Sequence, residues 1–395
     1  KHRTRLLLLA FTMARSSTVA CAIAALCLVA AVSALPSPPG YSFDDWLAEY
    51  PRTYSYGTAA YNMRRAIFNQ KAKEVEAHNA NRANTYTRTM RNRWADMTLE
   101  EIRATSHGGG VYHGPPTPYT RQYDATGDVD VSELPASIDY RNNGVLTAVK
   151  DQGNCGSCYA FASTESVESA VAISSGQLPV LSPQQAAFCT SNPNDCGGTG
   201  GCGGGTAELV FASIISIGGM ASQWTYPYMS YYGGSFQCQF KNSQSTGGTP
   251  PQAVVSSYVK LPHNNYTAVM NTLARTGPVA ISVDAAAWHD YDSGVYTGCG
   301  TDTVTLDHNV QMVGYGTDPK TGLDYWLVRN SWGASYGEEG FIRVHRFGMN
   351  APCAEDTSPG DGDGCNNGPK EIKVCGSCGI LYDTTYPIAH APTSA

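Results

Sequence analysis

Beyond its first 34 residues the sequence lacks any long apolar run, and it is poor in charge of either sign. No later stretch is apolar enough to cross a bilayer. Charged residues make up only 15% of the chain. From residue 133 to the end, 22 Asp and Glu stand against 11 Lys and Arg, so this part carries no basic patch. Nucleic acid is therefore not an expected ligand.

The sequence also lacks the ligand spacing of a metal site. Its nine histidines do not stand at zinc-ligand intervals from the cysteines. The acidic, glycine-rich stretch at 361–364 lacks the later ligands of a calcium loop, which favours a solvated surface loop. Zinc and calcium stay open as minor alternatives. We expect no metal and no cofactor.

The one long apolar run lies near the N-terminus. Met13 and Arg15 precede an apolar stretch over 18–32, which ends in Ser33-Ala34 and Pro36. A basic start, a short apolar run and small residues at its end predict a secretory signal cleaved after Ala34. A membrane anchor is the alternative, although the run is short for a span. Residues 1–34 are therefore expected to be upstream residues and signal peptide.

Thirteen cysteines are present, and eleven of them follow the predicted signal. An odd number in a secretory protein is typical of a disulfide scaffold with one working thiol. A basic segment precedes the acidic body, because nine basic and two acidic residues lie between Arg52 and Arg93. This asymmetry predicts an internal partner that is held partly by opposite charge.

The pattern of apolar residues divides the chain into three parts. The pattern predicts helices over 41–104 and an exposed linker over 118–131, after several Gly and Pro residues that break the helical pattern. Residues 158–174 predict one long core helix. Strands are expected at 279–283, 310–315, 325–329 and 341–345. A helix-rich half followed by a β-rich half gives the α+β class.

Thiol acyl transfer requires a cysteine, a histidine and a residue that orients the histidine, and the sequence has a candidate for each. Cys158 follows a Gly/Ser turn at a helix start, where the helix dipole stabilises a thiolate. His308 is the expected base, and Asn330 would orient its ring. Histidines 78, 107, 113 and 390 are expected in solvated positions. Gln152 would place an amide donor beside the Cys158 N–H to form an oxyanion hole.

The string Cys155-Gly156-Ser157-Cys158-Tyr159, with the later Asp307-His308-Asn309 and Asn330-Ser331-Trp332, resembles the papain family of cysteine proteases. Tyr159 stands where the family usually has tryptophan. The resemblance implies a papain-like two-lobed peptidase, with a helical lobe and a β-barrel-like lobe. It also implies peptide hydrolysis through a Cys158 acyl-enzyme, and a monomer acting on peptide or protein substrates.

The segment ahead of the predicted enzyme resembles a cathepsin L-type inhibitory propeptide. Arg64, Phe68, Val75 and Asn79 match its helix motif, and Asn92, Trp94 and Asp96 match the short motif that follows. The resemblance implies a zymogen with residues 35–132 as propeptide and linker and 133–395 as the enzyme. The propeptide would be a built-in inhibitor, and cystatin-like inhibitors are a further expected partner. Protonation of Asp and Glu, including Asp96, is expected to release the propeptide at acid pH.

The resemblance also implies three disulfides, Cys155–Cys202, Cys189–Cys238 and Cys299–Cys378. The pairing of Cys196, Cys353, Cys365 and Cys375 stays open. The implied substrate-binding residues are Gly204, Gly205, Thr206, Ala207, Ser282, Asp307, Asn309, Trp332 and Asp383. An acidic Asp383 in the pocket for the second residue before the scissile bond predicts acceptance of Arg as well as Leu or Phe.

Other functions on the same scaffold stay open at this point. A non-catalytic secreted binding protein would lose the cysteine or the histidine, and this chain keeps both. A peptide ligase or acyl transferase would share the acyl intermediate. The expected location is the secretory pathway, with a lysosomal or vacuolar compartment or the extracellular space as its end.

Overall fold

The computed structural model describes residues 37–241, 248–300, 303–359 and 364–392. The predicted signal segment, and the acidic stretch up to residue 363, lie outside the described residues. None of the described helices is both long enough and apolar enough to span a bilayer.

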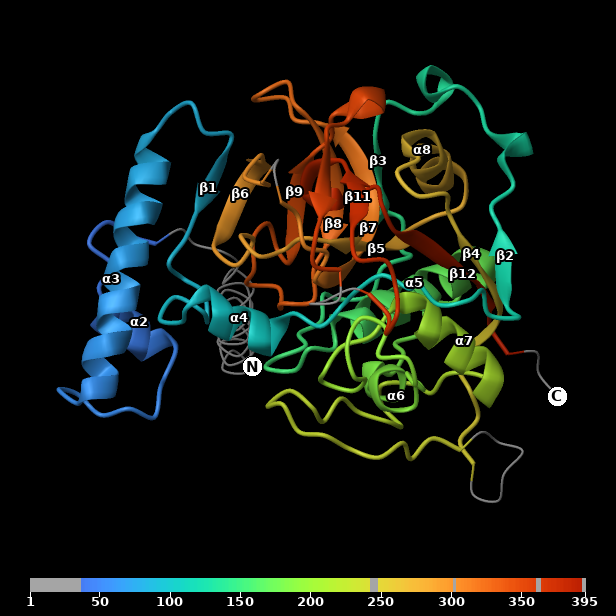
Figure 1. Ribbon diagram of the computed structural model, residues 1–395, viewed down its shortest axis with the longest axis horizontal. Helices are drawn as coiled ribbons and strands as arrows, with labels where there is room; N and C mark the ends of the chain where they lie inside the picture. The colour runs from blue at the N-terminus through green and yellow to red at the C-terminus, as the bar shows by residue number, and fades with distance from the viewer. Residues whose placement is uncertain (1–36, 242–247, 301–302, 360–363, 393–395) are drawn as a thin grey trace, which may run out of the picture.

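The segment ahead of the predicted enzyme forms a small helical domain with its own core. It contains α2 (Phe43–Glu49), α3 (Ala59–Ala80), β1 (Tyr86–Arg88) and α4 (Leu99–Ser106). Ser42 and Asp45 form a capping box at the start of α2. The core is aromatic, and it joins α2 to the long helix α3 through Phe43, Trp46, Tyr61, Phe68 and Val75. In Figure 1 this domain stands at one side of the sheet, and α4 leads from it toward the helices of the enzyme part.

The helical expectation for 41–104 is wrong at residues 86–88. These residues form β1, which pairs antiparallel with β6 (Tyr291–Tyr296) and so extends the sheet of the enzyme part. The predicted linker at 118–131 is also more ordered than expected. Residues Thr120–Gln122 form β2, which pairs parallel with β4 (Val254–Lys260) at the other edge. In both segments the hydrogen bonds come from a strand far away in the chain.

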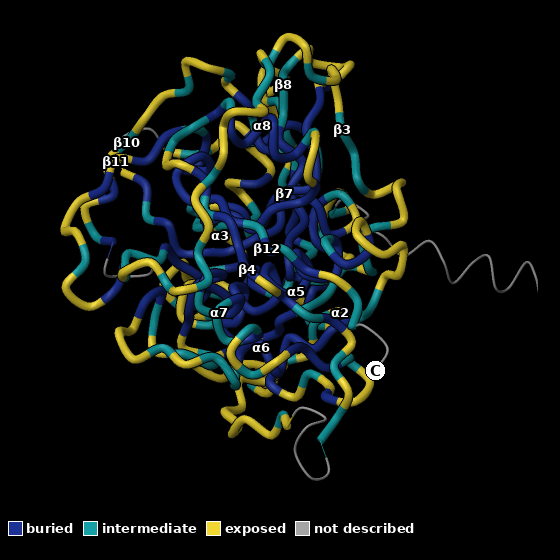
Figure 2. The backbone as a smooth tube through the Cα atoms, turned by 90° about the vertical axis from the view of Figure 1, so that its right-hand side faces the viewer, coloured by how far each residue is buried: buried dark blue, intermediate teal, exposed yellow. Residues whose placement is uncertain are grey.

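The helical lobe of the enzyme part contains α5 (Cys158–Ser175), α6 (Pro183–Phe188) and α7 (Ala207–Ile217). Helix α5 is the predicted core helix, and most of its tube has the buried colour in Figure 2, while residues 173–175 at its end are exposed. It ends at Gly176, whose φ of 72° is the left-handed conformation that favours glycine. The three helices share one apolar core.

The sheet lobe confirms the strand predictions within a few residues. It contains α8 (Tyr266–Arg275) and the strands β3 (Ile138–Asp139), β5 (Val279–Val283), β7 (His308–Thr317), β8 (Asp324–Arg329), β9 (Phe341–His345) and β12 (Thr384–His390). Among the described residues the strand order is β1-β6-β9-β8-β7-β5-β12-β4-β2, with β3 paired to β7. The α+β class and the two-lobed architecture are therefore confirmed.

A two-stranded hairpin follows β9. Strands β10 (Cys353–Asp356) and β11 (Ile372–Cys375) pair antiparallel outside the main sheet. The structure contains the three implied disulfides and two more, Cys196–Cys365 and Cys353–Cys375. Among the described cysteines, Cys158 alone is free.

Candidate active site

Cys158 is the first residue of α5, as the sequence predicts. Its side chain is fully buried, and its Sγ accepts a hydrogen bond from the backbone N–H of Asn309 at 3.5 Å. Burial raises the pKa of the Cys158 thiol to about 12, against the opposing effect of that backbone donor. In this covered state the cysteine is therefore a neutral thiol at physiological pH.

His308 begins β7, and Asn330 follows β8, so neighbouring strands bring the two side chains together. The Nε2 atom of His308 lies 2.9 Å from Oδ1 of Asn330. Its Nδ1 is buried and has no hydrogen-bond partner. Burial, and then the nearby His107, lower the pKa of His308 to about 3. The predicted base is thus held neutral in the covered site.

Trp332 covers the imidazole of His308. Its ring lies 4.9 Å from the His308 ring between centroids, and only 2% of the tryptophan is exposed. Trp94 packs edge-on against Trp332 at 4.8 Å. The indole therefore shields the His308–Asn330 hydrogen bond, which is stronger in a site of low dielectric constant.

Gln152 is fully buried beside this group. Its Nε2 donates to the carbonyl of Ser106 at 2.8 Å and to that of Cys155 at 2.9 Å, while Ser331 donates to its Oε1. Ser106 is the last residue of α4 in the propeptide-like segment. A peptide carbonyl from that segment therefore already accepts a hydrogen bond from the predicted oxyanion donor.

The propeptide-like chain continues along the glycine-rich wall. Gly108 accepts from the N–H of Gly205 at 2.9 Å, and the N–H of Gly110 donates to the Gly205 carbonyl at 3.1 Å. A Cβ on Gly204 would lie 2.9 Å from the Gly108 carbonyl oxygen. Glycine is required there because the two backbones approach so closely.

Two of the remaining predicted pocket residues, Ser282 and Asn309, contact Gly110 directly. Ser282 Oγ lies 3.2 Å from the Gly110 carbonyl oxygen and 3.1 Å from Oδ2 of Asp383. Asn309 accepts from the Gly110 N–H at 3.0 Å. Thr206 caps α7 and Ala207 begins it, and both are buried. The structure therefore brings these predicted residues together in one cleft.

Two charged residues beside Asp383 were not predicted. Lys260 Nζ lies 3.0 Å from Asp383 and 3.2 Å from Glu208, and it also donates to the Tyr112 carbonyl. Burial, and then the charge of Asp383, raise the pKa of Glu208 to about 7. The three side chains lie on separate elements, so no local motif in the sequence could have identified the cluster.

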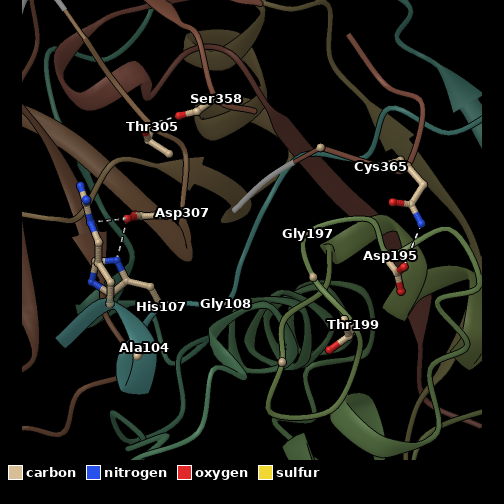
Figure 3. A pocket seen from close by; sticks show the side chains of 15 residues that line it. Ala104, His107, Gly108, Asp195, Gly197, Thr199, Thr305, Asp307, Ser358 and Cys365 are labelled. Atoms are coloured by element: carbon tan, nitrogen blue, oxygen red, sulfur yellow. Dashed lines mark hydrogen bonds and ion pairs between the residues drawn. The ribbon is translucent and has the colours of Figure 1, made fainter. Parts of the chain in front are cut away.

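His107 was expected in a solvated position, and this expectation is wrong. Figure 3 shows its ring directed at Asp307, where Nδ1 lies 2.7 Å from the carboxylate, and only 8% of the residue is exposed. Its ring also stacks on Trp332 at 6.0 Å. Asp307 and Trp332 thus contact the end of α4. The basic excess between Arg52 and Arg93 did not indicate this contact, because His107 lies outside that segment.

Comparison with known proteins agrees with this geometry. The profile of the papain family cysteine proteases matches residues 134–359, and that of the cathepsin propeptide inhibitor domain matches 43–102. Ananain of Ananas comosus is 35% identical over 355 residues, which are 89% of each chain.

Solved structures of precursors agree as well. A recombinant stem bromelain precursor is 34% identical with a TM-score of 0.68, covering 89% of this chain and 98% of its own. Digestive procathepsin L 3 of Tenebrio molitor is 28% identical with a TM-score of 0.67, covering 87% and 97%. The chain belongs to the papain family of cysteine proteases and carries a cathepsin-type propeptide inhibitor domain ahead of the enzyme.

Proposed function

We propose that this cysteine endopeptidase uses Cys158 as its nucleophile and His308 as its general base and acid. The Cys158 sulfur attacks the substrate carbonyl carbon, and the proton held by His308 passes to the leaving amine. Water then hydrolyses the thioester, with His308 accepting its proton. Asn330 keeps the imidazole oriented throughout.

The Gln152 amide and the Cys158 N–H would stabilise the oxyanion of each tetrahedral intermediate. One such donor contributes about 2.7–4 kcal/mol in comparable sites. The observation that carries the proposal is the contact of Gln152 Nε2 with a peptide carbonyl, that of Ser106, in the cleft that holds Cys158.

Labelling of the mature protein with an epoxysuccinyl thiol probe tests this assignment. We expect one adduct, mapped to Cys158, together with loss of peptidase activity. The Cys158→Ala variant should have neither label nor activity. An adduct elsewhere, or an active Cys158→Ala variant, would overturn the assignment.

The domain boundaries are part of the same proposal. Residues 1–34 would be upstream residues and signal peptide, 35–132 propeptide and linker, and 133–395 enzyme. The protein would then enter the secretory pathway and act in a lysosome, a vacuole or the extracellular space, as a monomer that cystatin-like proteins can inhibit. N-terminal sequencing of the secreted and processed forms tests the two cleavage positions.

Acid release of the propeptide is supported by buried histidines more than by carboxylates. Glu101 has its pKa lowered to about 2, chiefly by Arg64, so it stays ionised in mild acid. Burial lowers the pKa of His308 to about 3 and that of His113 to about 4. His113 was expected in a solvated position, but it is half-buried against Tyr382. Release returns both rings to water, where they take up protons more readily, so acid favours the open form.

The specificity proposal concerns Asp383. Its carboxylate accepts from the Ser282 hydroxyl, which also contacts the Gly110 carbonyl, and it pairs with Lys260. An Arg of a cleaved substrate would compete with Lys260 for this carboxylate, and Leu or Phe would be accepted as well. The Asp383→Ala variant should lose Arg substrates relative to Phe substrates. An unchanged ratio of kcat/KM for the two would contradict the proposal.

The acyl group on Cys158 could also be transferred to an amine instead of to water, which is a second outcome of the same acyl-enzyme. Incubation of a peptide substrate with and without an added amine nucleophile, followed by mass spectrometry, separates the two. We expect the hydrolysis product to dominate. A dominant amine adduct would make the protein a ligase, and no product at all would make it a binding protein.

A further inference from the structure

The hairpin that follows β9 is anchored on the sheet lobe. Cys353–Cys375 joins β10 to β11, and the Asp356 carboxylate accepts from the N–H of Leu306 at 3.2 Å. Asn264 exchanges two hydrogen bonds with β11, one with the Cys375 N–H and one with the carbonyl of the neighbouring Lys373. We call the hairpin with its connecting loop, residues 353–375, the insertion. Its two ends are therefore fixed to the sheet lobe.

The middle of the same insertion is fixed to the other lobe. The loop between α6 and α7 donates to it through the Gly197 N–H, which lies 3.1 Å from the Gly364 carbonyl. Asn366 donates through its N–H to the Asn194 carbonyl and through its amide to Asp195, both at 2.8 Å. The disulfide between Cys196 and Cys365 makes this attachment covalent. We call residues 364–366 the bridge segment.

The bridge segment lines a cavity of about 520 Å³. Figure 3 shows Cys365 near Asp195 and Gly197, with Thr305 and Ser358 of the sheet lobe and its insertion lining the same cavity. Propeptide residues between 103 and 108 line the cavity as well. The cavity thus lies in the cleft, next to the position of the covering peptide.

The covering peptide passes between the cleft wall and the insertion at residues 110–113. Gly110 is bound to Gly205 on one wall and to Asn309 on the other. Val111 is fully buried, in a cluster of apolar residues from the sheet lobe and from β11: Val304, Leu306, Ile372, Val374 and Tyr382. A Cβ on Gly368, just after the bridge segment, would lie 3.6 Å from the Cβ of His113.

We infer that the bridge segment, held by Cys196–Cys365, turns this part of the cleft into a closed channel that selects linear, extended polypeptide chains. A chain that occupies the place of residues 110–113 has to be threaded by a free end, because the segment 365–375 is attached covalently at both ends, through Cys365 to Cys196 of the helical lobe and through Cys375 to Cys353 of the sheet lobe. Cyclic peptides and the loops of folded proteins have no free end to thread. The inference rests on the proposed function of Cys158, and it adds the class of substrate.

The Val111 site suggests which linear chains fit. Ile372 and Val374 come from the insertion, so this apolar surface exists only because the hairpin is present. A small aliphatic side chain can be fully buried there, as Val111 is with 0% exposure. A test peptide should therefore carry valine on the N-terminal side of the scissile bond.

The test compares a linear peptide with its head-to-tail cyclic form of the same sequence. We expect the mature wild-type enzyme to cleave the linear form with a kcat/KM that is higher by on the order of 100-fold. Cys196→Ser/Cys365→Ser should cleave the cyclic form about tenfold faster than wild type, with the linear rate little changed. The matched control Cys353→Ser/Cys375→Ser removes a disulfide of the same insertion that does not cross the cleft, and it should keep the wild-type ratio.

Rates are normalised to active sites titrated with the epoxysuccinyl probe, and intact mass must show that the wild type keeps its five disulfides in the assay. Equal cleavage of both peptides by the wild type would overturn the channel. This comparison uses the wild-type enzyme alone, so it does not depend on the folding of any variant. An unchanged cyclic rate in Cys196→Ser/Cys365→Ser would also overturn it. If the linear peptide is not cleaved at all, the proposed function fails instead.

Discussion

Cys158 and His308 are both neutral while the propeptide covers them. With a thiol pKa of about 12 and an imidazole pKa of about 3, neither group changes charge between those values in the precursor. Water returns to both groups when the propeptide leaves, so the ion pair of thiolate and imidazolium can form. The propeptide therefore suppresses the reactivity of the sulfur as well as blocking access to it.

Alkylation of the sulfur with iodoacetamide should report this change. Near pH 6 we expect the precursor to be alkylated at Cys158 at least about 100-fold more slowly than the mature enzyme, since the thiolate is the reactive form. Intact mass against time gives both rates. Equal rates in the two forms would contradict the neutral state of the covered site.

His107 gives a second test at the scale of a residue. His107→Ala removes a charge-assisted contact with Asp307 and should weaken propeptide binding by about 1.5–3 kcal/mol. The precursor should then become active earlier at a fixed mildly acid pH, as followed with a fluorogenic peptide. His390→Ala, which changes an exposed histidine, is the control and should keep the wild-type time course.

The sequence could suggest candidates for the thiol chemistry because each candidate lies in a short string with its own local geometry. Cys158 begins a helix after a Gly/Ser turn, and Asn330 follows a strand directly. Lys260 could not be predicted in the same way. Its partners Glu208 and Asp383 lie on a helix and a loop that only the folded chain brings to it.

At the scale of elements, β1 binds the propeptide to the sheet. Its pairing with β6 is reinforced by Arg88, whose guanidinium lies 2.5 Å from the buried carboxylate of Asp290. Arg93 adds a contact of 2.6 Å to Asp151. The predicted attraction between a basic segment and an acidic body is confirmed in these two pairs.

Arg88→Ala should loosen this docking. It leaves Asp290 buried without its main partner, which costs about 1–3 kcal/mol. We expect faster autoprocessing at constant pH and a mature enzyme with unchanged kcat/KM, because residue 88 is absent from it. Lys73→Ala, an exposed charge change on α3, should process at the wild-type rate. If Arg88→Ala is also processed at the wild-type rate, the docking of β1 does not depend on the Arg88–Asp290 pair.

The strands β5, β8 and β9 could be predicted because their apolar runs are bounded by turn residues. Strands β1 and β2 could not, since each has only three residues and no buried side chain. Their hydrogen bonds come from β6 and β4, so pairing rather than local preference makes them strands.

At the scale of the whole molecule, the pH dependence of the precursor follows from its buried histidines. Burial lowers the pKa of His289 to about 4, as it does for His113, and that of His308 to about 3. Between these values and the ordinary pKa of about 6.5, each of these three histidines binds more protons in the unfolded chain than in the folded precursor, whereas Glu208, with its pKa raised to about 7, contributes in the opposite sense. The contribution of the histidines to the stability of the precursor therefore falls as the pH falls through this range, and we expect it to dominate.

Processing and melting of the precursor test this together. We expect slow processing at about pH 7.5, fast processing at about pH 4.5, and a Tm that falls over the same interval. The inactive Cys158→Ala precursor allows the Tm to be measured without cleavage. A Tm that is constant across the interval, with equal processing at both pH values, would contradict the histidine mechanism.

Only part of the disulfide connectivity could be predicted from the sequence. The three pairs implied by family resemblance are confirmed, whereas the pairs Cys196–Cys365 and Cys353–Cys375 join four cysteines whose pairing the resemblance left open. Several pairings of four cysteines are equally compatible with a sequence. The position of the hairpin against the helical lobe decides among them.

The loss of strand β2 on maturation would change one edge of the sheet in the mature enzyme. Cleavage ahead of Leu134 would remove Thr120–Gln122 and leave β4 as the last strand on that side of the sheet. An unpaired border strand offers its backbone groups to any extended chain in solution. Enzyme refolded from denaturant without its propeptide should therefore be prone to self-association, so the propeptide would also act as a temporary cover during folding.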